Sequence, residues 1–138
     1  HYYKFIFNWL YNWKKFFNND TEKFIIWCIP MLHRANKMRL SKNNHNINIS
    51  TWRSTIEKIE TQGINTMSLS DITGIPRPTV TRKLKTLILN KHLFMDKNKL
   101  IHPGDQGKYK AEMYNIQNSA LNEFSDFTSK IFNQIILK

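Results

Sequence analysis

Residues 67–103 read MSLSDITGIPRPTVTRKLKTLILNKHLFMDKNKLIHP, and this stretch decides the fold. Gly74 can adopt the left-handed backbone that ends one helix and redirects the chain. Pro76 and Pro78 follow, and proline is tolerated in the first turn of a helix because its missing N–H would have no partner there. The stretch therefore predicts a helix, a tight turn and a second helix that begins near Arg77.

Apolar residues of the second helix recur at helical spacing, as Val80, Leu84, Leu87 and Ile88. They predict a buried stripe on a recognition helix that spans about 77–90. The basic and polar side chains fall largely on other faces, and arginine and threonine can hydrogen-bond guanine or contact a thymine methyl in the major groove. The candidate DNA contacts on this helix are Arg77, Pro78, Thr79, Thr81, Arg82, Lys85 and Thr86.

A short β-hairpin is predicted over 93–102, because two apolar triplets flank the polar turn Asp96–Lys99. It would end at Pro103-Gly104. The tip carries the further candidate DNA contacts Lys97, Asn98 and Lys99. Together with Lys85 and Lys91, the two tip lysines would supply phosphate contacts. Helix, turn, helix and hairpin in this order are the elements of a winged helix-turn-helix.

The helix before the turn has two candidate starts. A cap at Asn65 gives a helix from Thr66 to Thr73, whereas Ser68-x-x-Asp71 resembles a capping box and gives a later start. We favour Asn65 because that helix directs Leu69 and Ile72 towards the core. Upstream, the pattern predicts a further helix that begins after Ser50 or Thr51, runs to about Gln62 and is ended by Gly63. Its inward residues would be Trp52, Ile56 and Ile59. We also expect Ile64 to pair with the hairpin.

The segment Gly74–Leu84, GIPRPTVTRKL, resembles the corresponding segment of bacterial winged-helix transcriptional regulators of the MarR and IclR types. The resemblance covers roughly 49–104. Ser70 stands where such units usually carry alanine, and Lys83 and Thr66 depart from the family's apolar pattern. It implies a DNA-binding unit whose flanking chain ends build a homodimer, and an effector pocket between the dimer helices and the DNA-binding unit.

The flanking segments are predicted to be helical and rich in exposed apolar surface. Over 3–17 the stripe is Ile6, Leu10, Trp13 and Phe17, and we expect dimerisation, with packing inside the chain and a membrane-surface helix as the alternatives. A second helix, from about Glu22 towards Arg39, contains Pro30 and should kink or break near Ile29. The predicted inward residues of this second helix are Phe24, Ile25, Cys28, Met31 and Leu32. A final helix begins near Ala111, and its apolar residues are Tyr114, Leu121, Phe124, Phe127, Ile131, Phe132 and Ile135.

The chain has 138 residues and a net charge of +11. Residues 77–99 carry a net +6, whereas residues 100–138 are neutral. Biased genome composition would spread lysine more evenly, so the basic segment favours an anionic partner. Three parts follow: 1–45 as N-terminal aromatic helices, 46–104 as a winged helix-turn-helix DNA-binding domain, and 105–138 as a C-terminal dimerisation helix. The predicted fold class is mainly α with a small β-hairpin wing.

Other function classes have little support in the sequence. The single cysteine, Cys28, excludes an internal disulfide and fits a reducing cytoplasm, as a small apolar group or, alternatively, a redox-sensing thiol. No catalytic residues, metal ligands, cofactor or membrane span are predicted. We expect a sequence-specific double-stranded DNA-binding regulator of transcription that acts as a homodimer and has an unidentified small-molecule effector. The alternative is a winged-helix module for protein contact.

Overall fold

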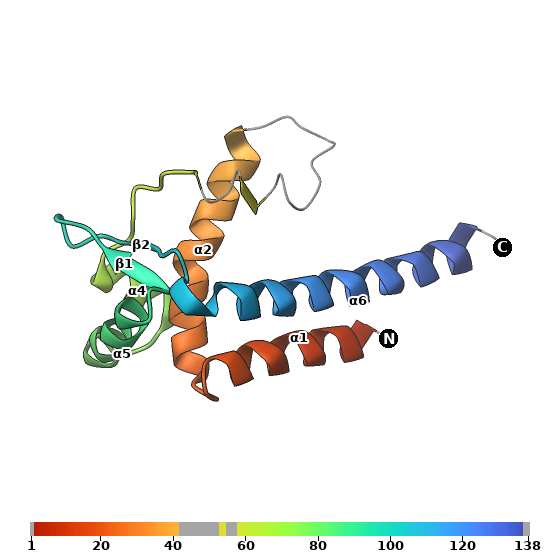
Figure 1. Cartoon of the computed structure of the whole chain (residues 1–138), viewed down its shortest axis with the longest axis horizontal. Helices are drawn as coiled ribbons and strands as arrows, with labels where there is room; N and C mark the ends of the chain where they lie inside the picture. Colours follow the sequence, from red (N-terminus) through yellow and green to blue (C-terminus); the bar gives the residue numbers. More distant parts are fainter. Residues whose placement is uncertain (1, 42–52, 55–57, 137–138) are drawn as a thin grey trace. The chain divides into compact units, whose positions relative to one another are not determined.

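The computed structural model describes residues 2–41, 53–54 and 58–136 (Figure 1). It is mainly helical with one small antiparallel hairpin, which confirms the predicted fold class at this coarse level. Contacts divide the chain into two units, 1–21 with 108–138 and 22–107. In chain order the elements are α1 (Tyr2–Phe16), α2 (Thr21–Ser41), α4 (Thr66–Thr73), α5 (Arg77–Leu89), β1 (Leu93–Met95), β2 (Ile101–Pro103), the 3-10 helix η1 (Gly107–Tyr109) and α6 (Lys110–Ile136).

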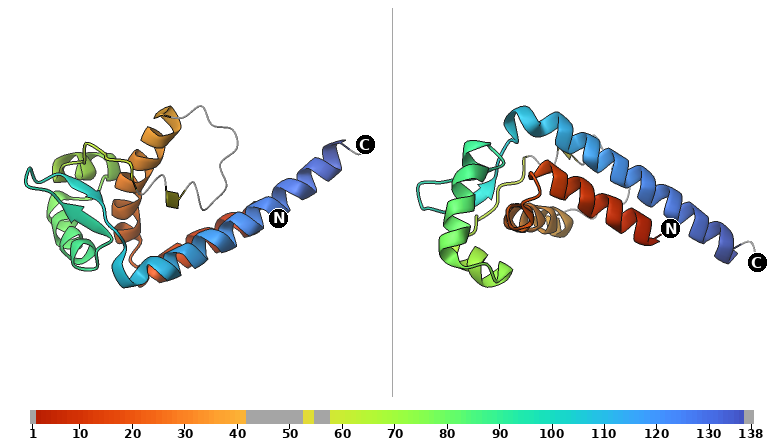
Figure 2. Two further views of the ribbon diagram at one scale, coloured as in Figure 1. Left: turned by 45° about the horizontal axis from the view of Figure 1, so that its top comes forward. Right: turned by 90° about the horizontal axis from the view of Figure 1, so that it is seen from below.

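The first unit is a pair of antiparallel helices, α1 and α6, that lie side by side (Figure 2). Aromatic contacts hold both ends of α1: the rings of Phe5 and of Phe124 in α6 are 5.6 Å apart, and Phe16 packs edge-on at 6.1 Å against Tyr109, the η1 residue directly before α6. Between these contacts the Asn8 amide donates to a Glu123 carboxylate oxygen at 3.2 Å. The C-terminal turns of α6 extend past the start of α1 (Figure 1), so they have no α1 residues beside them.

Only part of the predicted stripe on α1 is buried. Trp13 and Phe17 are buried, but Leu10 is 45% exposed. On α6 the apolar residues Leu121, Phe124, Ile131 and Phe132 are all exposed. One neighbouring helix covers only a narrow strip of a helix surface, so the remaining apolar residues of both helices stay in contact with solvent.

In the second unit the two helices α4 and α5 and the tight turn between them form as predicted. Asn65 caps α4 by accepting the Ser68 backbone N–H at 2.8 Å, and Gly74 has the left-handed φ of 68°. The Ser70 hydroxyl donates to the Ile75 carbonyl at 2.7 Å, which holds the corner closed. The second helix begins at Arg77, directly after Pro76.

The core of this unit collects apolar side chains from α4, α5 and the hairpin. Val80, Leu84 and Leu87 of α5 are buried as predicted, and Ile88 is half-buried. Leu69, Leu93 and Ile101 join them from α4 and the hairpin. Burying a side chain of this size contributes about 1.5–3 kcal/mol, so these residues fix how the elements pack.

The predicted inward face of α2 is wrong in part. Phe24 is buried, but Ile25 and Leu32 are exposed, and the buried residues are Ile26 and Trp27. The helix also runs unbroken through Pro30, so the predicted break is absent. The Pro30 ring is fully buried, and its packing compensates for the hydrogen bond that proline removes.

The helix predicted to reach Gln62 and to end at Gly63 is wrong at that end. Residues 59–63 lie outside any helix, and Ile64 instead exchanges backbone hydrogen bonds with Ile101 at 3.0 and 2.8 Å, as predicted for Ile64 itself. An extended chain is needed there because a helix could not present both the N–H and the C=O to β2. The predicted start at Ser50 or Thr51 and the inward Trp52 and Ile56 lie outside the described residues.

Within the described ranges, no helix combines the length and the apolar character needed to cross a membrane.

Candidate nucleic-acid interface

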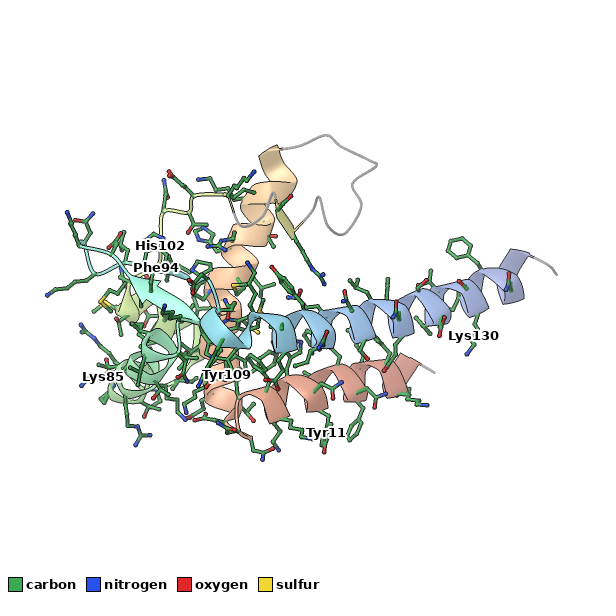
Figure 3. The ribbon with its side chains drawn as sticks, viewed as in Figure 1. Tyr11, Lys85, Phe94, His102, Tyr109 and Lys130 are labelled. Atoms are coloured by element: carbon green, nitrogen blue, oxygen red, sulfur yellow. The ribbon has the colours of Figure 1, made fainter. Side chains whose placement is uncertain are left out.

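The solvent face of α5 carries most of the side chains predicted to contact DNA. Arg77, Thr81 and Lys85 are exposed and follow one another at four-residue spacing, with the exposed Pro78 and Arg82 on the adjacent row. Thr79 and Thr86 are half-buried at the edge of this face. Lys85 is labelled in Figure 3. The buried stripe of Val80, Leu84 and Leu87 therefore directs these side chains outward.

Lys83 does not belong to this face. Its amine lies 3.0 Å from a Glu22 carboxylate oxygen of α2, and its side chain is only 12% exposed. Lys83 is one of the residues that give 77–99 its predicted positive charge. It occupies a position at which many of the winged-helix regulators that the segment resembles have an apolar residue. Burial of its aliphatic chain satisfies that apolar position, while Glu22 balances its charge.

The N-terminus of α5 is electrostatically positive. Pro76 occupies the cap position and supplies no side-chain hydrogen bond, and the first turn contains no acidic residue. The backbone N–H groups at a helix start and the helix dipole together attract anions. Arg77 adds a full charge at this end, so an anionic partner is favoured here.

The hairpin holds Lys97, Asn98 and Lys99 at its exposed tip. β1 and β2 pair with Phe94 opposite His102 and Met95 opposite Ile101. One Asp96 carboxylate oxygen accepts the backbone N–H of Asn98 at 2.9 Å and of Leu100 at 2.8 Å, and the Asp96 carbonyl accepts the N–H of Lys99. These bonds close the turn and fix the tip.

The other carboxylate oxygen of Asp96 faces the ring of His102. It lies 3.0 Å from His102 Nε2, and His102 Nδ1 lies 3.3 Å from the Thr61 hydroxyl. The hydrogen bond from His102, followed by that from the Leu100 N–H, lowers the pKa of Asp96 below its usual 3.8. Sequence reasoning missed this trio. An aspartate opening a polar turn was the available signal, but the contact with Thr61 depends on the extended segment before Ile64.

A second polar contact holds the base of the hairpin. His92 Nδ1 donates to the Gln106 side-chain oxygen at 2.9 Å, and the Gln106 amide donates to the carbonyls of His92 and Gly104 at 3.2 and 3.1 Å. Both side chains are buried. Burial, only partly opposed by the hydrogen bond to Gln106, lowers the pKa of His92 below 6.5.

The chain is expected to lose stability as the pH falls below 6.5, because the unfolded state then binds a proton that buried His92 resists. The His92 contribution is fully present above that pH and disappears as the pH falls towards the lowered pKa. Chemical denaturation between pH 7 and pH 5 measures this loss as a change in the free energy of unfolding. His92→Gln removes the titration and should flatten part of the slope, and equal slopes for both proteins would contradict the assignment.

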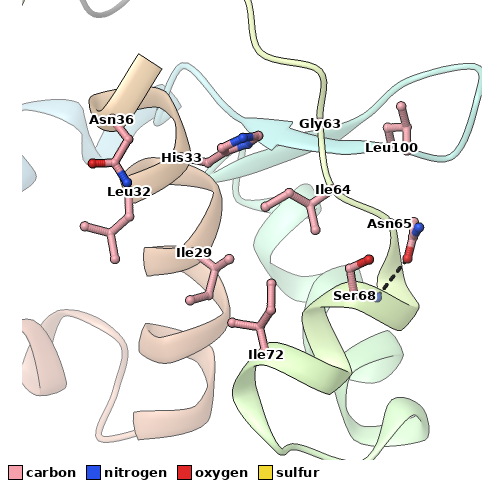
Figure 4. Close-up of a pocket in the computed structure, with 10 residues that line it drawn as sticks. All are labelled: Ile29, Leu32, His33, Asn36, Gly63, Ile64, Asn65, Ser68, Ile72 and Leu100. Carbon is pink, nitrogen blue, oxygen red and sulfur yellow. Dashed lines mark hydrogen bonds between the residues drawn. The ribbon is translucent and has the colours of Figure 1, made fainter. Parts of the chain in front are cut away.

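An open hollow of about 440 Å³ lies between α2 and α4, inside the second unit (Figure 4). Ile29 and Leu32 line it from α2, and Ile72 lines it from α4. Ile72 was predicted to point into the core but is 58% exposed. In the short helix α4 the buried residue is Leu69. The small-molecule effector that we expect from the sequence stays a prediction.

Two further groups bear on chemistry. Burial raises the pKa of the Cys28 thiol to about 12, so it stays protonated at neutral pH and is a poor nucleophile. Across 2–41, 53–54 and 58–136, no three histidine, cysteine or acidic side chains gather where they could hold a metal ion. Comparison with protein-family models, curated proteins and solved structures found no match.

Proposed function

We propose that this chain binds double-stranded DNA sequence-specifically, as a winged helix-turn-helix regulator of transcription. One observation carries the proposal: the arginines and lysine of the α5 solvent face stand on a helix whose start is positive and uncapped. In the proposed complex the first turns of α5 enter the major groove, where Arg77, Thr81 and Arg82 reach base edges. Lys85, Lys91, Lys97 and Lys99 contact phosphates.

The proposal includes a homodimer formed through the first unit. Large apolar side chains are exposed on both of its helices, among them Phe7 at 67% and Leu10 at 45% on α1, and Phe124 at 50% and Phe132 at 57% on α6. Surfaces of this kind mark interaction sites. A two-fold pair would place two recognition helices on half-sites about 34–36 Å apart.

Selection of bound sequences from a random duplex pool tests the proposal. A sequence-specific dimer should enrich an inverted repeat, and sedimentation should give twice the monomer mass of 16.5 kDa. Enrichment of a single half-site would refute the dimer but not the DNA binding. No enrichment, with weak binding that follows charge alone, would favour the protein-contact alternative.

Lys97→Ala should weaken binding to all duplex sequences alike, because a phosphate contact carries no base information. The slope of log K against log salt should decrease by about one. Fluorescence anisotropy titrations at several salt concentrations measure both effects. Lys14→Ala on α1 removes the same charge from a residue that is not among the proposed contacts and should leave the slope unchanged, and an equal change in both variants would contradict the contact.

A further inference from the structure

The wing carries an aromatic stack on its surface. Phe94 and His102 are opposite each other on β1 and β2, and their rings are 4.9 Å apart and inclined by only 14° (Figure 3). The Phe94 side chain nevertheless remains 48% exposed. Because His102 covers one face of the ring, the opposite face and the ring edge account for this exposure.

The His102 ring of this stack is held in place by its neighbours. His102 Nε2 contacts Asp96 at 3.0 Å and Nδ1 contacts the Thr61 hydroxyl at 3.3 Å. The Gly63 backbone closes one side, where a Cβ would lie 2.7 Å from the His102 ring. Thus His102 cannot turn without breaking two side-chain contacts, and it presents Phe94 in a fixed orientation.

The hairpin that carries the exposed ring has more basic than acidic residues. Asp96 is the only acidic residue between 90 and 104, and its carboxylate is already engaged by two backbone N–H groups and His102. Lys97 and Lys99 lie exposed at the tip that follows β1. An exposed aromatic ring on a hairpin whose tip carries two exposed lysines matches a ligand that has both a planar ring and a negative backbone.

We infer that Phe94, supported by His102, is a stacking platform for an unstacked nucleobase. Within an intact duplex both faces of every base are covered by neighbours, so the platform requires a base that is unpaired or turned out of the helix. The lysines of the tip would hold the adjacent phosphates, as in other surfaces that combine aromatic rings and cations to bind single strands. The inference rests on the proposed DNA binding and adds a preference for a locally opened strand.

The test uses the duplex obtained from the selection, with a single unpaired 2-aminopurine placed at successive positions across the site. The full chain should quench 2-aminopurine at the position that reaches the wing, and should bind that duplex more tightly than the intact one. Phe94→Ala should abolish the quenching and weaken binding to the bulged duplex by about tenfold. Binding to the intact duplex should change less than about twofold, because the platform is not used there.

Two variants make the result specific. Phe94→Leu keeps the apolar bulk on the hairpin but removes the ring, and it should lose the quenching while its thermal unfolding matches the wild type. Met95→Ala changes the neighbouring residue, which is 41% exposed, and should retain the quenching. Quenching that survives in Phe94→Leu, or equal losses on bulged and intact duplexes, would overturn the platform alone. A wild-type chain that binds no duplex would overturn the proposed function together with it.

Discussion

Gly104→Ala is expected to destabilise the protein by about 3 kcal/mol, at the upper end of the cost of overpacking. A Cβ at this position would overlap the Lys91 carbonyl oxygen and lie 2.9 Å from the His92 carbonyl carbon. Both are backbone atoms, which cannot rotate away as a side chain would. The Gly104 N–H also donates to the His92 carbonyl at 2.9 Å, so the shift that relieves the clash breaks the base of the hairpin.

Urea denaturation followed by circular dichroism measures this loss. Gly74→Ala is the matched control, because Gly74 has no atom within 4 Å of its Cβ position but has a φ of +68°. It should cost about 1–2 kcal/mol from backbone strain alone. If Gly104→Ala destabilises the protein no more than Gly74→Ala does, the end of the hairpin does not pack tightly against residues 91–92.

Arg82→Ala is expected to relax base preference at one position of the bound site, at a cost of about 1–3 kcal/mol in discrimination. Arg82 is exposed on the solvent face of α5, one turn after Pro78. A guanidinium can donate two parallel hydrogen bonds to guanine O6 and N7, which an alanine cannot replace. Affinities for the selected sequence and for all single-base variants of it measure the effect.

Arg82→Lys separates base recognition from charge. Lysine keeps the positive charge but lacks the planar fork, so overall affinity should largely return while the base preference does not. Lys97→Ala should behave in the opposite way, with weaker binding and intact preference. If Arg82→Ala and Lys97→Ala weaken every sequence equally, Arg82 does not read a base.

Local sequence signals were sufficient for the helix-turn-helix and the hairpin. Asn65, Gly74 and Pro76 each specify a backbone conformation through short-range chemistry, and α4 and α5 begin and end where these residues require. The stripe of Val80, Leu84 and Leu87 then settled which face of α5 is buried. The exposed positions of Arg77 and Arg82 follow from that stripe by helical geometry.

Features that depend on residues far apart in the chain could not be predicted from local sequence patterns. On α2 the pattern allowed more than one inward face, and only the packed neighbours selected Ile26 and Trp27 over Ile25 and Leu32. The segment before Ile64 was predicted to be the end of a helix, but the pairing of Ile64 with Ile101 requires an extended backbone. Lys83 contributed to the net charge predicted for residues 77–99, but in the structure Glu22, 61 residues earlier in the chain, pairs with it.

The sequence alone determined where the corner, the basic helix and the hairpin lie, because caps, glycine and proline act over a few residues. Tertiary structure alone decided which cations are free for a partner, and it brought Thr61, Asp96 and His102 together beneath Phe94. Charge pairing and ring stacking depend on distances through space, and those distances exist only once the hairpin and the extended segment have packed together.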